Sequence, residues 1–378
     1  MNMMTSPSTL MAASNNWASR PDDQRFTCLD TMLEFARTQR RASKSLALAS
    51  TKIEAQPITD DNDIVRGLAI VGQGEVPSVP SHWAFGQLAA RIQAPAGYLR
   101  RLPADLAADC INDGLQRRAV EDVGALLRQT ANGIPDLAAL TGPNYGRVWN
   151  SDVIEALRQR FGDGITGQFT VPGEFGIALD EVTKANTTLF ASDRDMFVFL
   201  ADEKNRIEMP NRRNGQPGSL ARGFFVWNSE VGATTLGIAT FLFDYVCCNR
   251  IVWGAEGYQE IKVRHSAGAP VKFMRDVAPA IQAYANSSAQ GIQDAIVAAQ
   301  AKKIGGEDEV HEFLTKRRRF TQTQAKAINL AHVAEEGRPI ETIWDATVGV
   351  TAYAKHLKHQ DARIELEREG GKIMNLAA

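Results

Sequence analysis

Cationic residues gather in two segments of the chain, and their types and spacing suit contact with a phosphate backbone. The first segment, 202–223, is long and rich in Gly, Pro and Asn, which is typical of a functional or mobile loop. The second, 314–326, places four consecutive cations before a phenylalanine, whose ring can stack on a base. The candidate nucleic-acid-binding residues are Arg206, Arg212, Arg213, Arg222, Lys316, Arg317, Arg318, Arg319 and Phe320.

Two explanations of these cations stay open. The formal net charge of the chain is only -2, which excludes a basic surface over the whole molecule, but the two segments, folded together, could make one local basic groove. Alternatively, the cations of segment 314–326 form a solvated face, although four in a row must wrap around a helix. The groove is therefore a prediction about tertiary structure.

A second group of candidate residues surrounds the apolar run 222–254, which contains the sequences WNSE and CCNR. In an extended strand alternate side chains face opposite sides, which predicts a core position for Trp227 and a turn at its end. The residues of this structural motif are Asn228, Glu230, Asn249, Arg250 and His265, with Arg250 or Asn249 as the expected partner of Glu230.

Enzymatic chemistry has weaker support in the sequence. There is no GxSxG, no P-loop and no dinucleotide fingerprint, so we predict no nucleotide hydrolysis and no cofactor. A metal-dependent hydrolase or nuclease remains an alternative, although the spacing of its candidate ligands matches no ligand motif. The candidate ligands are Asp193, Asp195, Glu230, Asp244, Cys247, Cys248 and His265.

The elements that must position these residues predict an α+β fold. We expect a disordered arm over 1–24, a helical N-terminal region over 25–163, a largely antiparallel β-rich domain over 164–268 and a helical region over 269–378. Ser81 is a candidate N-cap, and Gly337 is expected to end a helix. The stretch 239–254 fits either a strand or a helix.

Composition adds limits to the class of protein. Hydrophobic residues make up 44% of the 378 residues, enough for a sizeable core, and no apolar stretch has the length of a membrane span. The start lacks the pattern of a signal peptide, and the four cysteines form no CxxC. We therefore expect a cytoplasmic protein with reduced thiols and no membrane contact.

Several blocks of the sequence resemble one known family. "LFASDRDMFVFLAD", "ARGFFVWNSEVGATTLGIATFLFDYVCCNRIVWG" and "VRHSAG" are similar to the domain-of-unknown-function family nine-three-two, as are blocks near both ends of the range 80–375. The resemblance implies a phage or plasmid setting, and so a bacterial host, but it carries no catalytic residues.

Two functions are compatible with this setting. The first is binding and annealing of single-stranded DNA in recombination, by a homo-oligomer that hydrolyses no nucleotide. The alternative is an accessory or counter-defence protein that binds a phage or host protein.

Overall fold

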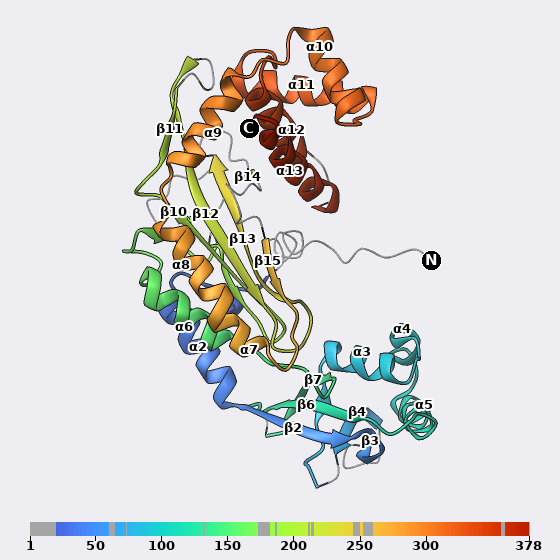
Figure 1. The fold of residues 1–378 in the computed structure, drawn as a ribbon. Coiled ribbons are helices and arrows are strands. Elements are labelled where there is room, and N and C mark those ends of the chain that lie inside the picture. The colour runs from blue at the N-terminus through green and yellow to red at the C-terminus, as the bar shows by residue number, and fades with distance from the viewer. Residues whose placement is uncertain are drawn as a thin grey trace.

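The protein is described by a computed structural model, and residues 20–59, 65–72, 74–131, 133–172, 182–185, 187–210, 212, 215–244, 250–251, 260–356 and 360–377 are described. A long antiparallel sheet joins two smaller units that project to the same side (Figure 1). We call these units the N-terminal arm, residues 43–149, and the C-terminal arm, residues 290–377. The combination of helices and antiparallel strands confirms the predicted α+β class.

The central sheet has nine strands in the described part of the chain, and every neighbouring pair is antiparallel. Its order is β1-β9-β10-β12-β13-β14, while β8 pairs with β10, β11 with β12 and β15 with β13. The strands are β1 (Arg25–Phe26), β8 (Phe169–Thr170), β9 (Leu189–Ala191), β10 (Met196–Asp202), β11 (Ile207–Met209), β12 (Gly218–Asn228), β13 (Leu236–Asp244), β14 (Arg250–Ile251) and β15 (Glu260–Val263).

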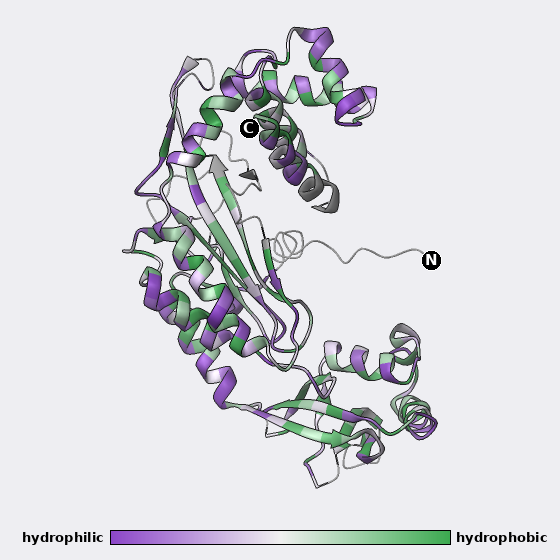
Figure 2. Cartoon of the chain, viewed as in Figure 1, coloured by the Kyte–Doolittle hydropathy of each residue, from purple (hydrophilic) through white to green (hydrophobic). Residues whose placement is uncertain are grey.

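Helices cover one face of this sheet. Val198, Phe224 and Ile238 on that face belong to a hydrophobic core shared with the helices. Figure 2 shows largely hydrophobic strands beside helices that carry alternating hydrophilic and hydrophobic stripes, as expected for helices with one buried side. The covering helices are α2 (Leu29–Arg41), α6 (Asn150–Phe161), α7 (Ala269–Lys272), the π-helix η4 (Phe273–Val277) and α8 (Ala278–Asn286).

The opposite face is aromatic. Phe225 stacks on Phe199 and on Trp227, with ring centroids 4.9 Å apart in both pairs. Gly237 lies beside Trp227 on the neighbouring strand, and a Cβ there would sit 2.2 Å from the indole ring, so only glycine leaves room for it. Trp227 is fully buried, which confirms its predicted place in the core.

The N-terminal arm contains helices and a second sheet. The sheet has the order β2-β6-β7-β5, and a separate hairpin is formed by β3 and β4. Ser81 caps α3 as predicted, since its Oγ accepts a hydrogen bond from Ala84 N at 3.1 Å. The elements are β2 (Ser43–Ala49), η2 (Ser50–Lys52), β3 (Ile53–Thr59), β4 (Val65–Gly72), β5 (Val79–Pro80), α3 (His82–Arg91), α4 (Ala96–Leu99), α5 (Ala104–Gln116), β6 (Asp122–Arg128) and β7 (Asp136–Thr141).

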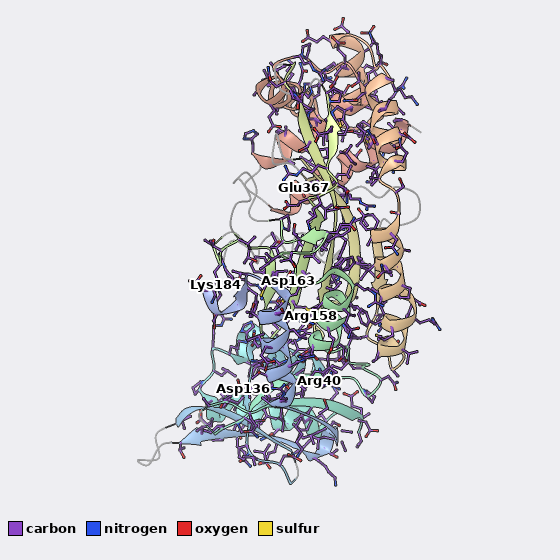
Figure 3. All side chains as sticks on the ribbon, turned by 90° about the vertical axis from the view of Figure 1, so that its left-hand side faces the viewer. Arg40, Asp136, Arg158, Asp163, Lys184 and Glu367 are labelled. Carbon is purple, nitrogen blue, oxygen red and sulfur yellow. The ribbon has the colours of Figure 1, made fainter. Side chains whose placement is uncertain are left out.

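The predicted division of the chain needs two corrections. Region 25–163 is not only helical, because strands such as β2 (SKSLALA) and β6 (DVGALLR) contain Ala and Leu, which favour helices when pairing is ignored. Nor does it end before the central sheet, because α2 and α6 pack on that sheet. An ion pair of Arg158 with Asp30 joins these two helices. Figure 3 labels Arg158 on α6.

The C-terminal arm is helical, as predicted. Its central helix, α12, is buried along residues 343–352 by its neighbours. Capping boxes at Thr321 and Thr342 begin α11 and α12, and Gly337 ends α11 at a φ of 74°, as expected. The helices are α9 (Gln290–Ala301), α10 (Glu307–Glu312), the π-helix η5 (Phe313–Arg317), α11 (Gln322–Glu336), α12 (Ile343–Lys355), α13 (Gln360–Met374) and η6 (Asn375–Ala377).

Three further expectations concern the ends of elements. Of the segment 1–24 that we predicted to be disordered, residues 1–19 lie outside the described residues, and η1 (Asp22–Gln24) is a short helix. The ambiguous stretch 239–254 is strand up to Asp244, and most of its remainder is not described. Among the described residues, none of the helices combines the length and the apolar character needed to cross a membrane.

Candidate functional site

The turn that follows β12 inserts into the N-terminal arm, and we call this contact the N-terminal joint. Asn228 Nδ2 donates to the Val148 carbonyl and to Asn150 Oδ1, both at 2.8 Å. The Tyr145 hydroxyl donates to the Ser229 carbonyl at 2.8 Å. The WNSE sequence therefore ends a core strand and fastens it to a segment about eighty residues earlier in the chain.

Glu230 is the charged centre of this joint. Its carboxylate accepts from Arg128 Nη2 at 2.6 Å and from Asn150 N at 2.8 Å, and Arg147 donates to its backbone carbonyl. The side chains of Glu230 and Arg128 are only 2% and 7% exposed. Burial raises the pKa of Glu230, while Arg128 and the Asn150 N–H oppose that shift. The pair is thus a desolvated ion pair with hydrogen bonds on both carboxylate oxygens.

The expected partner of Glu230 was wrong. We predicted Arg250 or Asn249, whereas the carboxylate bonds to Arg128 and to the Asn150 backbone. Arg250 lies in β14 opposite Phe243, with only its backbone described, and Asn249 lies outside the described residues. The pairing spans 102 residues, so local spacing gave no access to it.

His265 belongs to the same joint. It follows β15, its Nδ1 lies 3.1 Å from the Gly146 carbonyl, and its ring stacks on Tyr145 with centroids 4.9 Å apart. Burial lowers the pKa of His265, which favours the neutral ring. A Cβ at Gly146 would lie 1.8 Å from the Ser266 carbonyl oxygen, so glycine is required where the two segments meet.

Several of the candidate metal ligands that the structure describes are engaged by other residues. Asp195 forms a buried ion pair with Arg20, and the Asp193 backbone carbonyl accepts from Arg128 at 2.7 Å. Within the residues that the structure describes, no three His, Cys, Asp or Glu side chains gather as metal ligands would. Cys247 and Cys248 lie outside the described residues, and the side chain of Asp244 is not described.

Arg212, a predicted phosphate contact, is instead an interior residue. Its guanidinium is fully buried, donates to Glu336 Oε1 from Nη2 at 2.7 Å and from Nε at 3.0 Å, and lies 5.6 Å from the centre of the Trp344 ring. Since Glu336 is the last residue of α11, this contact fastens the C-terminal arm to the sheet. We call it the C-terminal joint.

Arg222 is likewise unable to reach a phosphate, being 3% exposed. Its Nη2 lies 3.1 Å from Asp202 Oδ2, and it also donates to the carbonyls of Tyr284, Ala285 and Ser287 at 3.3, 3.2 and 2.5 Å. These carbonyls end α8, where a cation also complements the helix dipole. Arg222 therefore caps a helix.

The four-cation segment is divided between interior and surface. Phe320 is 9% exposed and part of the core of the C-terminal arm, so it cannot stack on a base, and Arg318 is held by Glu369. Arg317 and Arg319 are exposed, and neither side chain has an ion-pair or hydrogen-bond partner in the described part of the chain. Lys316 is also exposed, with Glu312 3.0 Å away.

The two cationic segments do not form the predicted groove. Arg212 meets the last residue of α11, whereas Arg319 comes just before its first turn. A helix of 15 residues is about 22 Å long at about 1.5 Å per residue, which separates the two positions. Arg206, within the first segment, is exposed, and Arg213 lies outside the described residues.

Several residues of interest were absent from the sequence predictions. Arg128, Arg147 and Tyr145 build the N-terminal joint, and nothing in their local sequence marks them as its partners. The sequence YLRR, residues 98–101, does carry a signal, since an aromatic residue next to two cations is typical of nucleic-acid contacts. Tyr98 and Arg101 are both exposed at the surface of the N-terminal arm.

Comparisons with known proteins reach the family level. A family model described as Domain of unknown function (DUF932) matches residues 177–372, a segment that begins before β9 and ends within α13. No match was found among the curated proteins or among the solved structures. The matched segment contains Asn228, Glu230 and Glu336, while Arg128 lies outside it. The N-terminal joint therefore connects the matched segment to the preceding part of the chain.

Proposed function

Because the chain belongs to the Domain of unknown function (DUF932) family, whose description gives no activity, we propose from its geometry that it binds single-stranded DNA without hydrolysing a nucleotide. In this proposal the protein aids strand annealing, and several copies bring complementary strands together. The observation that carries it is the pair of exposed arginines, Arg317 and Arg319, at the start of α11.

The local structure suits phosphate contact. Arg318 is tied inward to Glu369, and Arg319 adopts a φ of 60°, which is uncommon for a residue other than glycine. The turn is further held by Phe320 N, which donates to the Leu314 carbonyl at 3.0 Å. Arg317 and Arg319 are therefore presented on a fixed backbone, which lowers the entropy lost when a phosphate is bound.

The side chains that a metal-dependent hydrolase would use as ligands are held in contacts within the fold, which favours a binding function over catalysis. Glu230 and His265 lie in the N-terminal joint, and Asp195 is paired with Arg20. Their hydrogen bonds connect segments of the fold and leave them committed to structural contacts. We therefore propose that the exposed Arg317 and Arg319 serve in binding.

Fluorescence anisotropy with a labelled oligothymidine, measured over a range of salt concentrations, tests the proposal. Arg317→Glu combined with Arg319→Glu is expected to weaken binding at least about tenfold, because two attractive interactions become repulsive. Replacing both arginines with Ala should lower the slope of log K against log salt by about 0.7 for each phosphate that the protein no longer neutralises.

The matched control is Arg117→Glu with Arg118→Glu, an exposed pair at the end of α5 that undergoes the same change in charge. We expect its affinity to stay close to that of the unchanged protein. Equal losses in the two variants would mean that only overall charge matters, and would remove Arg317 and Arg319 as the binding site.

A second candidate function, docking of another protein chain, is favoured by the surface of α11. Leu330 and Val333, one turn apart on this helix, are 69% and 39% exposed. Neighbouring exposed apolar residues on one helix face form a patch that a partner chain can cover. If the partner is a second copy, Leu330→Asp with Val333→Asp should lower the mass measured by light scattering. An unchanged protein that is monomeric at all concentrations would exclude the second copy.

A further inference from the structure

Tyr98 is an unusual surface residue. It is 55% exposed, and no other Phe, Tyr or Trp in the described part of the chain is comparably exposed. A tyrosine usually covers its ring with neighbouring apolar groups, because the ring gains free energy from burial. An aromatic ring held in water at one point of the surface is a feature that a stacking partner would explain.

The neighbouring residues fix this ring in place. Tyr98 lies in α4, between Pro95 and Pro103, and Leu99 beside it is buried in the core of the N-terminal arm. Arg100 donates to the His82 carbonyl at 2.7 Å, and its guanidinium lies 5.1 Å from the centre of the Phe85 ring. The residues on the C-terminal side of Tyr98 therefore anchor α4 to α3.

Arg101 completes the surface. Its backbone N–H donates to the Tyr98 carbonyl at 3.0 Å, so the two residues follow one tight turn. Its side chain is exposed and has no ion-pair or hydrogen-bond partner among the described residues. An exposed ring with an unengaged cation three residues later is the pair of groups that contacts one nucleotide, by stacking on the base and by attraction to the phosphate.

We propose that Tyr98 and Arg101 form a second contact site for the same single strand, with an unpaired base stacked on Tyr98 and a phosphate bound by Arg101. This inference rests on the proposed function. Its geometric support is the shape of the molecule: α4 lies at the surface of the N-terminal arm, and both arms project to the same side of the central sheet (Figure 1).

A strand held at both arms has a measurable consequence. An oligonucleotide too short to span the arms binds at one site only. A longer strand binds the second site as an intramolecular event, so its affinity rises steeply once the span is reached. The dependence of affinity on length therefore reports the second site.

The experiment measures anisotropy with oligothymidines from about 8 to about 60 nucleotides, lengths that bracket common single-strand site sizes. The unchanged protein should show a step in affinity with length. Tyr98→Ala with Arg101→Ala should lower the affinity for the long strands about tenfold and leave that for the short ones unaffected. Tyr98→Trp should retain the step, because the larger ring also stacks.

The matched control is Leu106→Ala with Arg118→Ala, an exposed apolar residue of α5 and an exposed cation just after that helix, in the same arm. It should keep the full step. If binding needs Arg317 and Arg319 but the Tyr98→Ala, Arg101→Ala variant follows the unchanged protein at every length, the second site is overturned and the proposed function stands. An unchanged protein with no affinity at any length overturns both.

Discussion

The two joints attach the arms to the central sheet through the same kind of ion pair. The partner that contributes the arginine at one joint contributes the carboxylate at the other. At the N-terminal joint the sheet contributes the carboxylate of Glu230 and the arm contributes Arg128. At the C-terminal joint the segment before β12 contributes Arg212 and the arm contributes Glu336. In both, the arginine and the carboxylate are nearly or fully buried. A buried guanidinium paired with a carboxylate thus sets the place of each arm.

The joints differ in what surrounds the ion pair. The turn after β12 also receives hydrogen bonds from Trp83 and Gln87, which both donate to the Val231 carbonyl at 2.9 and 2.8 Å. At the C-terminal joint the Arg212 guanidinium instead lies over the Trp344 ring. A loop rich in Gly, Pro and Asn can therefore carry an interior arginine, and its composition does not reveal the partner.

The largest expected effect lies at the N-terminal joint. Glu230→Ala leaves Arg128 buried without its carboxylate, and should lower the free energy of unfolding by about 4 kcal/mol, as measured by urea denaturation. The control is Glu155→Ala, which removes a pair with Arg37 whose side chains are 41% and 40% exposed, and should cost at most about 1 kcal/mol. Similar losses in the two variants would contradict the distinction between joint and surface.

The C-terminal joint should respond somewhat less. Arg212→Met is expected to cost about 3 kcal/mol of unfolding free energy, because Glu336 stays buried without its cation. Adding Glu336→Leu removes that charge, so the double variant should regain part of the loss in the same denaturation experiment. If the two costs simply add, the ion pair does not determine the stability of this joint.

A smaller, pH-dependent effect is expected within the C-terminal arm. Burial acts to raise the pKa of Asp345, but the hydrogen bond from Arg338 and the His332 ring, whose Nε2 lies 3.6 Å from the carboxylate, hold it below its ordinary value of 3.8. A lowered folded pKa gives stability above the unfolded pKa, which is lost as the pH falls through the folded pKa. Asp345→Asn should therefore cost about 1 to 2 kcal/mol at neutral pH.

Urea denaturation of this variant between neutral pH and about pH 2 provides the check. The difference from the unchanged protein should shrink below the ordinary pKa of 3.8, as the carboxylate becomes protonated. A difference that stays constant over the whole range would mean that Asp345 stabilises the arm through packing and the cap of α12 alone.

The smallest effect is expected at an exposed ion pair between α10 and η5. Lys316 and Glu312 form a pair whose side chains are 74% and 59% exposed, so Lys316→Ala should change the free energy of unfolding by less than about 0.5 kcal/mol. Thermal denaturation at low and high salt measures it. A cost as large as that at either joint would remove the contrast between interior and surface cations.

Local sequence signals predicted many parts of the fold. The aromatic alternation around Trp227 indicated a core strand, Ser81 indicated a helix start and Gly337 a helix end, and each is found. The signals worked because strand alternation, capping and the left-handed conformation depend on a few adjacent residues. The strands β2 and β6 of the N-terminal arm escaped prediction because only their pairing makes them strands.

The candidate site was harder to predict. Of the cations expected at a groove, Arg212 and Arg222 are interior, Arg318 is paired, and Arg317 and Arg319 keep the exposure that binding requires. All five are arginines, so residue type alone does not distinguish the buried ones from the exposed ones. Tyr98 and Arg101 were not predicted as site residues, because their exposure depends on how the surrounding segments fold.

Local residue patterns were enough to establish the fold class, the core strand with Trp227 and the limits of several helices, because these follow from periodicity, capping and residue size. Which charges are buried, and against which partner, depended on the folded arrangement of distant segments. Glu230 meets Arg128 across 102 residues and Arg212 meets Glu336 across 124. The free energy of a charge depends on its desolvation and on its nearest opposite charge, and both are set by residues far away in the chain.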